Sequence, residues 1–255
     1  DDLPGEIAEE YFTAIAIAGG TISSGNQAAV LTMLESLQTA GLLQKIRALY
    51  LMHGNTLDSA KIETLNPTTN PGSYPITWNG TPSLFSSGGF TATAENYAIT
   101  AHPDAIGLTP LTGAGLVFYA DSGGNNDATC GCENFFFWPR KDGAIYGYLT
   151  LGNGAAQYVA TDNAIGGLHC GTRESQSGSV KAYRNATRWM NLTSAISLEM
   201  FNIGTNAIRF GGTKISGSHL TSTATIRLAA ITRGIPEDSI ATLNTIIQDY
   251  RAAIA

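Results

Sequence analysis

The chain has 255 residues, of which 43% are hydrophobic and only 13% are charged, with a net charge of −6 at pH 7. This length is enough for one all-β domain with a substantial core. The low charge and the lack of a Lys/Arg cluster argue against a nucleic-acid-binding surface. No apolar run approaches the roughly 18 residues that cross a membrane, so we expect no membrane insertion.

The N-terminus carries no visible targeting signal. Asp1 to Glu6 lack the basic and apolar regions of a signal peptide. The chain also begins without Met, which indicates a processed, a trimmed or a fragmentary N-terminus. These three alternatives stay open.

Residues 6–45 are expected to form two helices. Glu6–Ile17 is rich in Ala, Ile and Glu, and Gly19–Gly20 interrupts this pattern. Ser24 and Gln27 have the spacing of a capping box at the start of the second helix. Apolar residues then fall on one helical face, namely Val30, Met33, Leu34 and Leu37. The pattern predicts a helical hairpin, residues 1–45, that packs on the remainder of the chain.

From residue 46 onward the pattern changes to short strands separated by turns rich in Gly, Asn and Asp. The expected strands are Ile46–Met52, Pro75–Trp78, Ser83–Ser87, Tyr97–Ala101, Gly115–Ala120, Asn134–Trp138, Ile145–Leu151, Gln157–Ala160, Leu168–Thr172, Ser179–Arg184, Ile196–Ile203 and Thr223–Ile231. About a dozen short strands without a repeat of fixed period predict an antiparallel two-sheet sandwich or jelly roll. No internal linker is visible, so residues 46–255 are expected to form one unit.

A final helix is predicted at 236–254. Pro236 suits a first helical position, and Glu237 and Asp238 suit the positive end of the helix dipole. An apolar stripe follows, made of Ile240, Leu243, Ile246, Ile247, Tyr250 and Ile254. We expect it to pack on the outer face of a sheet or against the N-terminal helices.

The three cysteines are Cys130, Cys132 and Cys170, and their odd number argues against a disulfide framework. Cys130 or Cys132 could pair with Cys170 if their strands are neighbours, which the sequence leaves open. His169 next to Cys170 also allows a zinc set, but the one-residue gap between Cys130 and Cys132 fits structural zinc sites poorly. Buried reduced thiols are the favoured interpretation. The histidines, His53, His102, His169 and His219, are interpreted as ordinary loop or strand residues.

Several segments resemble a recurrent bacteriophage structural module. Lys45-Ile-Arg-Ala-Leu-Tyr-Leu-Met-His-Gly54 is similar to its strand "Lys-x-x-Ala-Ile-Tyr-Pro-Phe-x-Gly", and Lys61-Ile-Glu-Thr-Leu-Asn-Pro67 to its "Lys-x-Asn-Leu-x-x-Pro". Val180-Lys-Ala-Tyr-Arg-Asn185 resembles the "Val-x-x-Tyr-Arg-Asn-Gly" hairpin of laminin G-like and concanavalin A-like jelly rolls. Here Ala186 replaces the hairpin Gly. The resemblance covers nearly the whole chain, and it rests on the order and spacing of these segments together.

The resemblance implies a laminin G-like jelly roll in a virion, as a tail, fibre or surface appendage module. Its expected partners are other virion proteins and host-surface glycans, and its expected assembly is a homo-oligomer, with a trimer favoured by the family. Two alternatives remain: capsid decoration without a ligand, and a polysaccharide-degrading enzyme of the sandwich-glucanase type. Fold resemblance alone does not establish function.

No catalytic signature is present. Sandwich glycosidases need two carboxylates on one strand face, whereas the comparable strand here carries Glu199 alone. We therefore expect a protein that is not an enzyme, in which Asp121 and Asp127 are the first acids to test if glycan is nevertheless cleaved. No Gly-x-Ser-x-Gly, His-Glu-x-x-His or phosphate loop occurs.

Three weaker patterns concern ligands. The loop Asp121–Asp127 offers oxygen ligands for a rim calcium ion, although its Gly-Asn composition favours an ordinary hairpin turn. Tyr146, Tyr148, Trp138 and Trp189 could stack on sugars, but Phe135–Trp138 is more typical of a strand buried on both faces. Three N-glycosylation patterns, at Asn79, Asn185 and Asn191, are about as many as chance provides.

Overall fold

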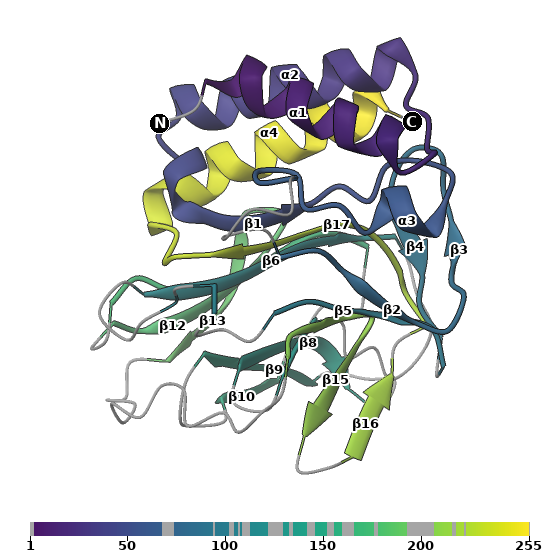
Figure 1. Ribbon diagram of the computed structural model, residues 1–255. Coiled ribbons are helices and arrows are strands. Elements are labelled where there is room, and N and C mark those ends of the chain that lie inside the picture. The colour runs from purple at the N-terminus through teal and green to yellow at the C-terminus, as the bar shows by residue number, and fades with distance from the viewer. Residues whose placement is uncertain are drawn as a thin grey trace.

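The computed structural model describes residues 3–67, 74–93, 95–101, 105–106, 108, 113–121, 130–132, 135–141, 146–151, 156–159, 166–175, 178–192, 207–215, 218–221 and 223–254. At 135–136, 138–141, 146–151, 156–159, 192, 213–215 and 218–221 it describes the backbone alone. The described chain forms three layers: helices, a first sheet beneath them, and a second sheet on the far side (Figure 1). Both termini lie at the helical layer.

The helical layer joins segments from the two ends of the chain. Its members are α1 (Pro4–Ile17), α2 (Ser24–Thr39) and α4 (Ile240–Ala253). Shorter helical segments are η1 (Leu43–Lys45), α3 (Leu57–Ala60) and η3 (Glu237–Ser239). The N-terminal hairpin is therefore confirmed, but Ser23 caps α2, one residue before the predicted Ser24, by accepting a hydrogen bond from the Asn26 N–H.

The sheet beneath the helices, here called sheet A, is antiparallel throughout its described pairings. Its strand order is β13 (Thr187–Leu192), β12 (Val180–Arg184), β11 (Gly167–Arg173), β6 (Ala114–Ala120), β17 (Thr225–Thr232), β4 (Phe90–Thr91) and β3 (Ser83–Leu84). β17 pairs with β4 at its start and with β1 (Ile46–Tyr50) at its end. The first and the last strands of sheet A along the chain, β1 and β17, are thus paired with each other.

The second sheet, sheet B, is also antiparallel. Its order is β10 (Ala156–Val159), β9 (Tyr146–Leu151), β8 (Phe135–Lys141), β7 (Cys130–Cys132), β14 (Arg209–Phe210), β5 (Tyr97–Ile99) and β2 (Thr77–Asn79). A hairpin of β15 (Gly212–Ile215) and β16 (Ser218–Thr221) projects beside it (Figure 1). The predicted fold, a two-sheet jelly-roll sandwich with helices from both ends of the chain, is confirmed. The expected strand Ile196–Ile203 lies outside the described residues.

Sheet A separates two apolar cores. The inter-sheet core, between the two sheets, includes Ala48, Tyr50, Phe90, Phe118, Phe137 and Phe210. The helix-side core, between sheet A and the helices, includes Ile15, Leu34, Leu49, Val117, Leu228 and Ile247. Burial on both faces explains why β17 is an almost continuous apolar run, because neighbouring residues must each enter an apolar layer.

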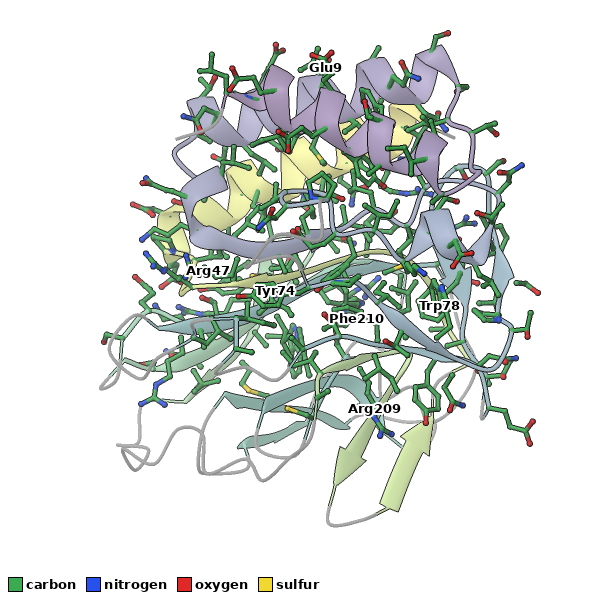
Figure 2. All side chains as sticks on the ribbon, in the orientation of Figure 1. Glu9, Arg47, Tyr74, Trp78, Arg209 and Phe210 are labelled. Carbon is green, nitrogen blue, oxygen red and sulfur yellow. The ribbon has the colours of Figure 1, made fainter. Side chains whose placement is uncertain are left out.

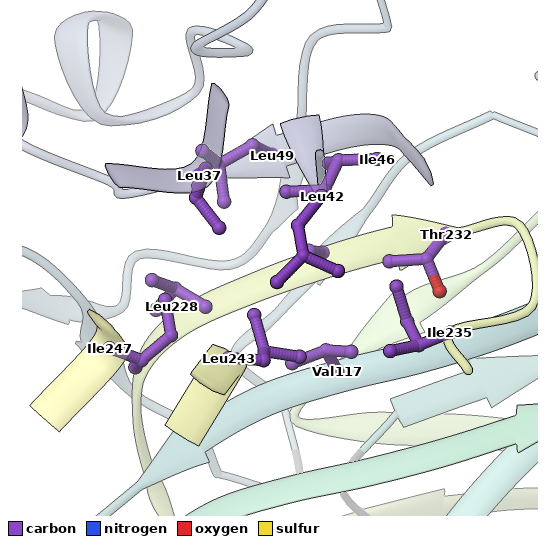
Figure 3. A pocket seen from close by; sticks show the side chains of 11 residues that line it. Leu37, Leu42, Ile46, Leu49, Val117, Leu228, Thr232, Ile235, Leu243 and Ile247 are labelled. Carbon is purple, nitrogen blue, oxygen red and sulfur yellow. The ribbon is translucent and has the colours of Figure 1, made fainter. Parts of the chain in front are cut away.

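The closing helix packs as its stripe predicts. Each of the predicted stripe residues is at most 8% exposed, and the helix lies against both α2 and sheet A (Figure 1). Its packing leaves a small apolar cavity of about 10 Å³, lined by side chains that include Leu37, Val117 and Leu243 (Figure 3). A space of this size holds at most about one water molecule, so we interpret it as a packing gap.

Candidate functional site

The turn between β3 and β4 is a polar junction between the helical layer and sheet A. It closes through hydrogen bonds from the Phe85 N–H to the Gly89 carbonyl (3.1 Å) and from the Gly88 N–H to the Phe85 carbonyl (3.0 Å). Gly88 has φ +82°, and a Cβ there would lie 2.5 Å from the Leu51 carbonyl oxygen. Glycine is needed at this position because both the backbone angle and the space exclude a side chain.

Side chains from three different elements bind three successive carbonyls of this turn. Asn26 of α2 donates to the Ser86 carbonyl at 3.4 Å. Arg251 of α4 donates to the Ser87 carbonyl at 3.2 Å. Arg227 of β17 donates to the Gly88 carbonyl at 3.3 Å. The turn therefore links the helical layer to sheet A.

Two arginines and one carboxylate meet at this turn. The Nε of Arg227 lies 2.6 Å from the Oδ2 of Asp121, and its guanidinium stacks 4.0 Å from the ring centre of Phe85. Burial, and secondly the charge of Arg227, lower the pKa of Arg251. Two positive groups and one negative group leave a local excess of one positive charge, on a chain whose net charge is −6. We call the set Phe85, Ser87, Asp121, Arg227 and Arg251 the rim cluster.

A buried polar pair lies on the same side of the molecule, below the end of α4. The Nε2 of His53 is 2.6 Å from the hydroxyl of Tyr250, and the His53 N–H donates to the Tyr11 hydroxyl at 3.3 Å. Burial lowers the pKa of His53 to about 4, so its ring is neutral at pH 7. His53 lies in the loop after β1, as interpreted, and it is fully buried. Its backbone N–H contacts Tyr11 of α1, and its ring contacts Tyr250 of α4.

The predicted calcium loop is only partly described. Asp121 is described, and a guanidinium occupies one of its carboxylate oxygens and places a positive charge where a cation would bind. Residues 122–129, with Asp127, lie outside the described residues. No cluster of three or more metal-binding side chains occurs among the residues that the structure describes.

The catalytic predictions are also only partly covered. Glu199 lies outside the described residues. Glu63, a buried acid, accepts three backbone hydrogen bonds, from the N–H groups of Leu49 (2.9 Å), Leu65 (2.8 Å) and Asn66 (2.7 Å). Burial raises the pKa of Glu63 to about 7. We assign Glu63 a structural role, since it holds the segment after α3 against β1.

All three cysteines are buried free thiols, as the favoured interpretation predicted. Cys170 lies in the helix-side core, whereas Cys130 and Cys132 lie in the inter-sheet core. Sheet A separates them, so the open alternative of a disulfide to Cys170 is excluded. The zinc set is excluded for the same reason, because His169 stacks on Phe118 on the inter-sheet side, away from Cys170.

Of the aromatic residues considered as sugar platforms, the structure describes the side chain of Trp189. Trp189 stacks on Phe137, with ring centres 5.9 Å apart, and packs against the inter-sheet core. The side chains of Trp138, Tyr146 and Tyr148 lie outside the described residues. Figure 2 shows Phe210 between the sheets and Arg209 on the opposite face of the same short strand, where Arg209 lies 5.0 Å from the ring centre of Tyr97.

The asparagine side chains of two glycosylation patterns have structural roles. The Asn79 amide donates to the Glu95 carbonyl at 2.6 Å. The Asn185 Oδ1 accepts a hydrogen bond from the Leu168 N–H at 2.9 Å. The asparagine side chains thus serve turns and strand ends in this fold.

A shallow groove of about 310 Å³ lies between α2 and α4. Small side chains line most of it, among them Gly25, Ala28 and Ala253, and Asp249 adds a negative charge. None of the helices in the described part of the chain has the length and apolarity to span a membrane.

Comparison with protein-family models and with curated proteins yields no match. Solved structures do match. The chain is similar to a mutant Trypanosoma rangeli sialidase that displays trans-sialidase activity, with 10% identity, a TM-score of 0.53, and coverage of 88% of this chain and 39% of that one. It is similar to botulinum neurotoxin type C, which interacts with two ganglioside molecules, with 12% identity, a TM-score of 0.50, and coverage of 80% and 51%.

A third similar structure is domain 4 of an extracellular family 43 arabinanase from Geobacillus stearothermophilus, in complex with arabinotriose. The identity is 15%, the TM-score is 0.51, and the match covers 78% of this chain and 98% of that domain. The chain therefore spans at most about half of the sialidase and neurotoxin chains, but nearly all of the arabinanase domain. At such low identities these matches show the fold alone.

Proposed function

We propose that this chain is a carbohydrate-binding jelly roll without catalytic activity, which serves in a bacteriophage virion as a tail, fibre or surface appendage module. Its ligand is a host-surface glycan, and its other partners are virion proteins. The resemblance of segments across the chain to a phage structural module supports the virion role. The sandwich fold supports the binding role.

One observation carries the carbohydrate proposal. The arabinanase domain is a unit of comparable architecture, almost completely covered by this chain, and it was solved with a bound trisaccharide. The fold is thus compatible with oligosaccharide binding by a unit of this size. Weak binding at one site gains strongly when several copies act together, as in the trimer favoured by family resemblance.

The test of the binding role is a glycan array with purified protein, followed by titration of each bound oligosaccharide. Specific binding of at least one bacterial surface oligosaccharide is the expected result. Binding to none, together with incorporation of the protein at a fixed lattice position in purified particles, would favour capsid decoration instead.

The test of catalysis uses bacterial surface polysaccharide and an assay for new reducing ends. We expect no release, and we expect Glu199→Gln to retain both host attachment and incorporation into particles. Release that Glu199→Gln abolishes would instead establish a glycosidase, with Asp121 and Asp127 as the first candidates for the second acid.

A further inference from the structure

We propose that the rim cluster binds the carboxylate of an acidic sugar, between the guanidinium groups of Arg227 and Arg251. This inference rests on the proposed carbohydrate-binding function and assigns it a place and a ligand class. The sequence patterns that suggested sugar-binding aromatic residues and a calcium loop do not include either arginine.

The first argument is the arrangement of charge. Arg227 and Arg251 reach the same turn from β17 and α4, and they bind the adjacent carbonyls of Gly88 and Ser87. Their guanidinium groups are close enough for each positive charge to oppose the other. Asp121 forms an ion pair with Arg227, and its charge also partly offsets that of Arg251, so one negative charge faces two positive ones. An incoming carboxylate would relieve this repulsion, and the forked guanidinium geometry matches a carboxylate better than an ammonium does.

The guanidinium of Arg251 also has an unused hydrogen-bond donor. Among the described residues, the Nε of Arg251 is buried and has no hydrogen-bond partner. Buried polar atoms normally have a partner, and leaving a charged donor unpaired costs free energy. Because this atom is buried, a ligand would pair with it only after the Arg251 guanidinium has turned outward. Nη1 of the same side chain donates to the Ser87 carbonyl.

The third argument favours a sugar over a simple anion. Hydroxyl and amide groups are present at the same turn, where Ser86 is exposed and Ser87 and Asn26 are half-buried. Phe85 adds a partly buried aromatic ring. This mixture of hydroxyl, amide and aromatic groups around a charged pair suits a carboxylated pyranose, which presents many hydroxyls and one charge.

The role of Asp121 makes the proposal sharply testable. Its carboxylate competes with the ligand for Arg227 and repels a negative sugar. Asp121→Asn keeps the size of the side chain but removes this charge. If the cluster is a carboxylate site, the substitution tightens binding of the acidic sugar. If the arginines only brace the turn, breaking the ion pair cannot improve binding.

The experiment uses pairs of oligosaccharides that differ in the carboxylate alone. Galacturonate and glucuronate trisaccharides are each compared with their carboxyl-reduced forms, and sialyllactose with lactose, by calorimetric titration at low and high salt. We expect at least one acidic member to bind roughly tenfold or more tighter than its neutral partner, which is typical of one charge-assisted hydrogen bond. High salt is expected to reduce this preference, since the cluster is partly exposed.

The variants assign the preference to the cluster. Arg251→Gln is expected to abolish it, and Asp121→Asn to increase it roughly threefold to tenfold. Arg209→Gln is the matched control, because Arg209 also stacks on an aromatic ring but lies on sheet B, and it is expected to change nothing. Circular dichroism and thermal melting of each variant establish that it is folded.

The outcomes separate the two proposals. Neutral and acidic members that bind equally would overturn the carboxylate site and leave the carbohydrate function in place. A preference that survives Arg251→Gln, or that Arg209→Gln removes, would place the site elsewhere. Failure of every oligosaccharide in the glycan array and in the titrations would overturn both.

Discussion

The helix-side core and the inter-sheet core lie on opposite faces of one sheet, and they are packed in different ways. The helix-side core is largely aliphatic and receives the stripe of α4, with the His53–Tyr250 pair at one end. The inter-sheet core is built around aromatic contacts, such as Tyr50 with Phe210 and Phe118 with Phe137. The first is formed by three helices from both ends of the chain on sheet A, and the second by many short strands.

The two cores should therefore respond differently to substitutions. The helix α4 contacts the remainder of the protein through one apolar stripe. A single charge in this stripe should therefore disturb the packing of the helical layer. Between the sheets, each strand contributes only a few side chains, and a lost ring leaves a local cavity. Substitutions in the two cores are therefore expected to destabilise the protein by different mechanisms and by different amounts.

The largest effect is expected for Ile247→Asp in the helix-side core. Ile247 is 2% exposed, and the carboxylate would be buried without a partner. We expect a loss of about 5 kcal/mol in the free energy of unfolding, measured by urea denaturation. Thr242→Asp, on the exposed face of the same helix, is the control and should change stability by less than about 0.5 kcal/mol. Equal melting temperatures for wild type and Ile247→Asp would show that α4 does not anchor the layer.

A cavity in the inter-sheet core should cost somewhat less. Phe137 is fully buried and contacts the rings of Phe118, His169 and Trp189. Phe137→Ala removes these contacts and is expected to destabilise the protein by about 3 to 4 kcal/mol. Phe137→Leu should recover more than half of this loss, because it refills most of the space. Equal losses for the two variants would indicate that ring contacts, and not the cavity, set the cost.

The dependence of stability on pH should reveal two opposing groups. Burial lowers the pKa of His53 from 6.5 in the unfolded chain to about 4 in the folded protein, so only the unfolded chain gains a proton between these values. Its contribution falls by up to about 3 kcal/mol as pH decreases through this window. Glu63 titrates at about 7 when folded and 4.5 when unfolded, so the folded chain gains the proton and stability rises as pH decreases.

These contributions overlap between pH 4.5 and 6.5. We expect the stability of the wild type to change little across this interval. Glu63→Gln, which removes one of the two titrations, should become progressively less stable as pH falls. Urea denaturation at several pH values measures both slopes. A flat profile for Glu63→Gln would show that burial does not hold the His53 ring neutral.

The pair of His53 and Tyr250 can be separated from the apolar packing around it. Tyr250→Phe keeps the ring but removes the hydroxyl 2.6 Å from the Nε2 of His53. We expect a loss of about 1 to 2 kcal/mol, because the His53 nitrogen is left buried without its partner. A double-mutant cycle with His53→Ala should give a coupling energy of at least about 0.5 kcal/mol. Additive losses would mean that the contact contributes only packing.

The comparison also explains what the sequence could and could not predict. The helix-side core was predictable because the α4 stripe repeats with a single helical period and continues for several turns. In the inter-sheet core, the two-residue strands β4 and β14 are too short to show any alternation, and β7 contributes only Cys130, Gly131 and Cys132. Such elements exist only through pairing with distant strands, which local patterns do not record.

The rim cluster was missed for a related reason. Its members come from a turn, a strand end, a central strand and the closing helix, so no local spacing joins them. One signal was present, since Arg227 interrupts the apolar run of β17, and a charge inside a central strand needs a partner. The sequence offered no means to identify Asp121 as that partner, because the two residues are 106 positions apart.

The smallest expected effect concerns the hairpin between β12 and β13, where Ala186 follows Asn185. Asn185 has φ +45° and Ala186 has φ +65°, so both turn residues have the left-handed backbone that favours Asn and Gly. The Ala186 methyl partly compensates for the strain by packing against the helix-side core.

Ala186→Gly therefore sets backbone strain against packing. Relief of the left-handed conformation is worth about 1 to 2 kcal/mol, whereas the added flexibility of the unfolded chain and the lost methyl contact together offset about 1 kcal/mol. We expect a net stabilisation of about 0.5 kcal/mol, measured as a small rise in the urea midpoint without a change in slope. Asn185→Gly is the control: it tolerates the same backbone but loses the acceptor for the Leu168 N–H, and it should destabilise. If Ala186→Gly also destabilises the protein, the methyl contact contributes more stability than relief of the strain does. The helix-side core would then extend along sheet A beyond α4.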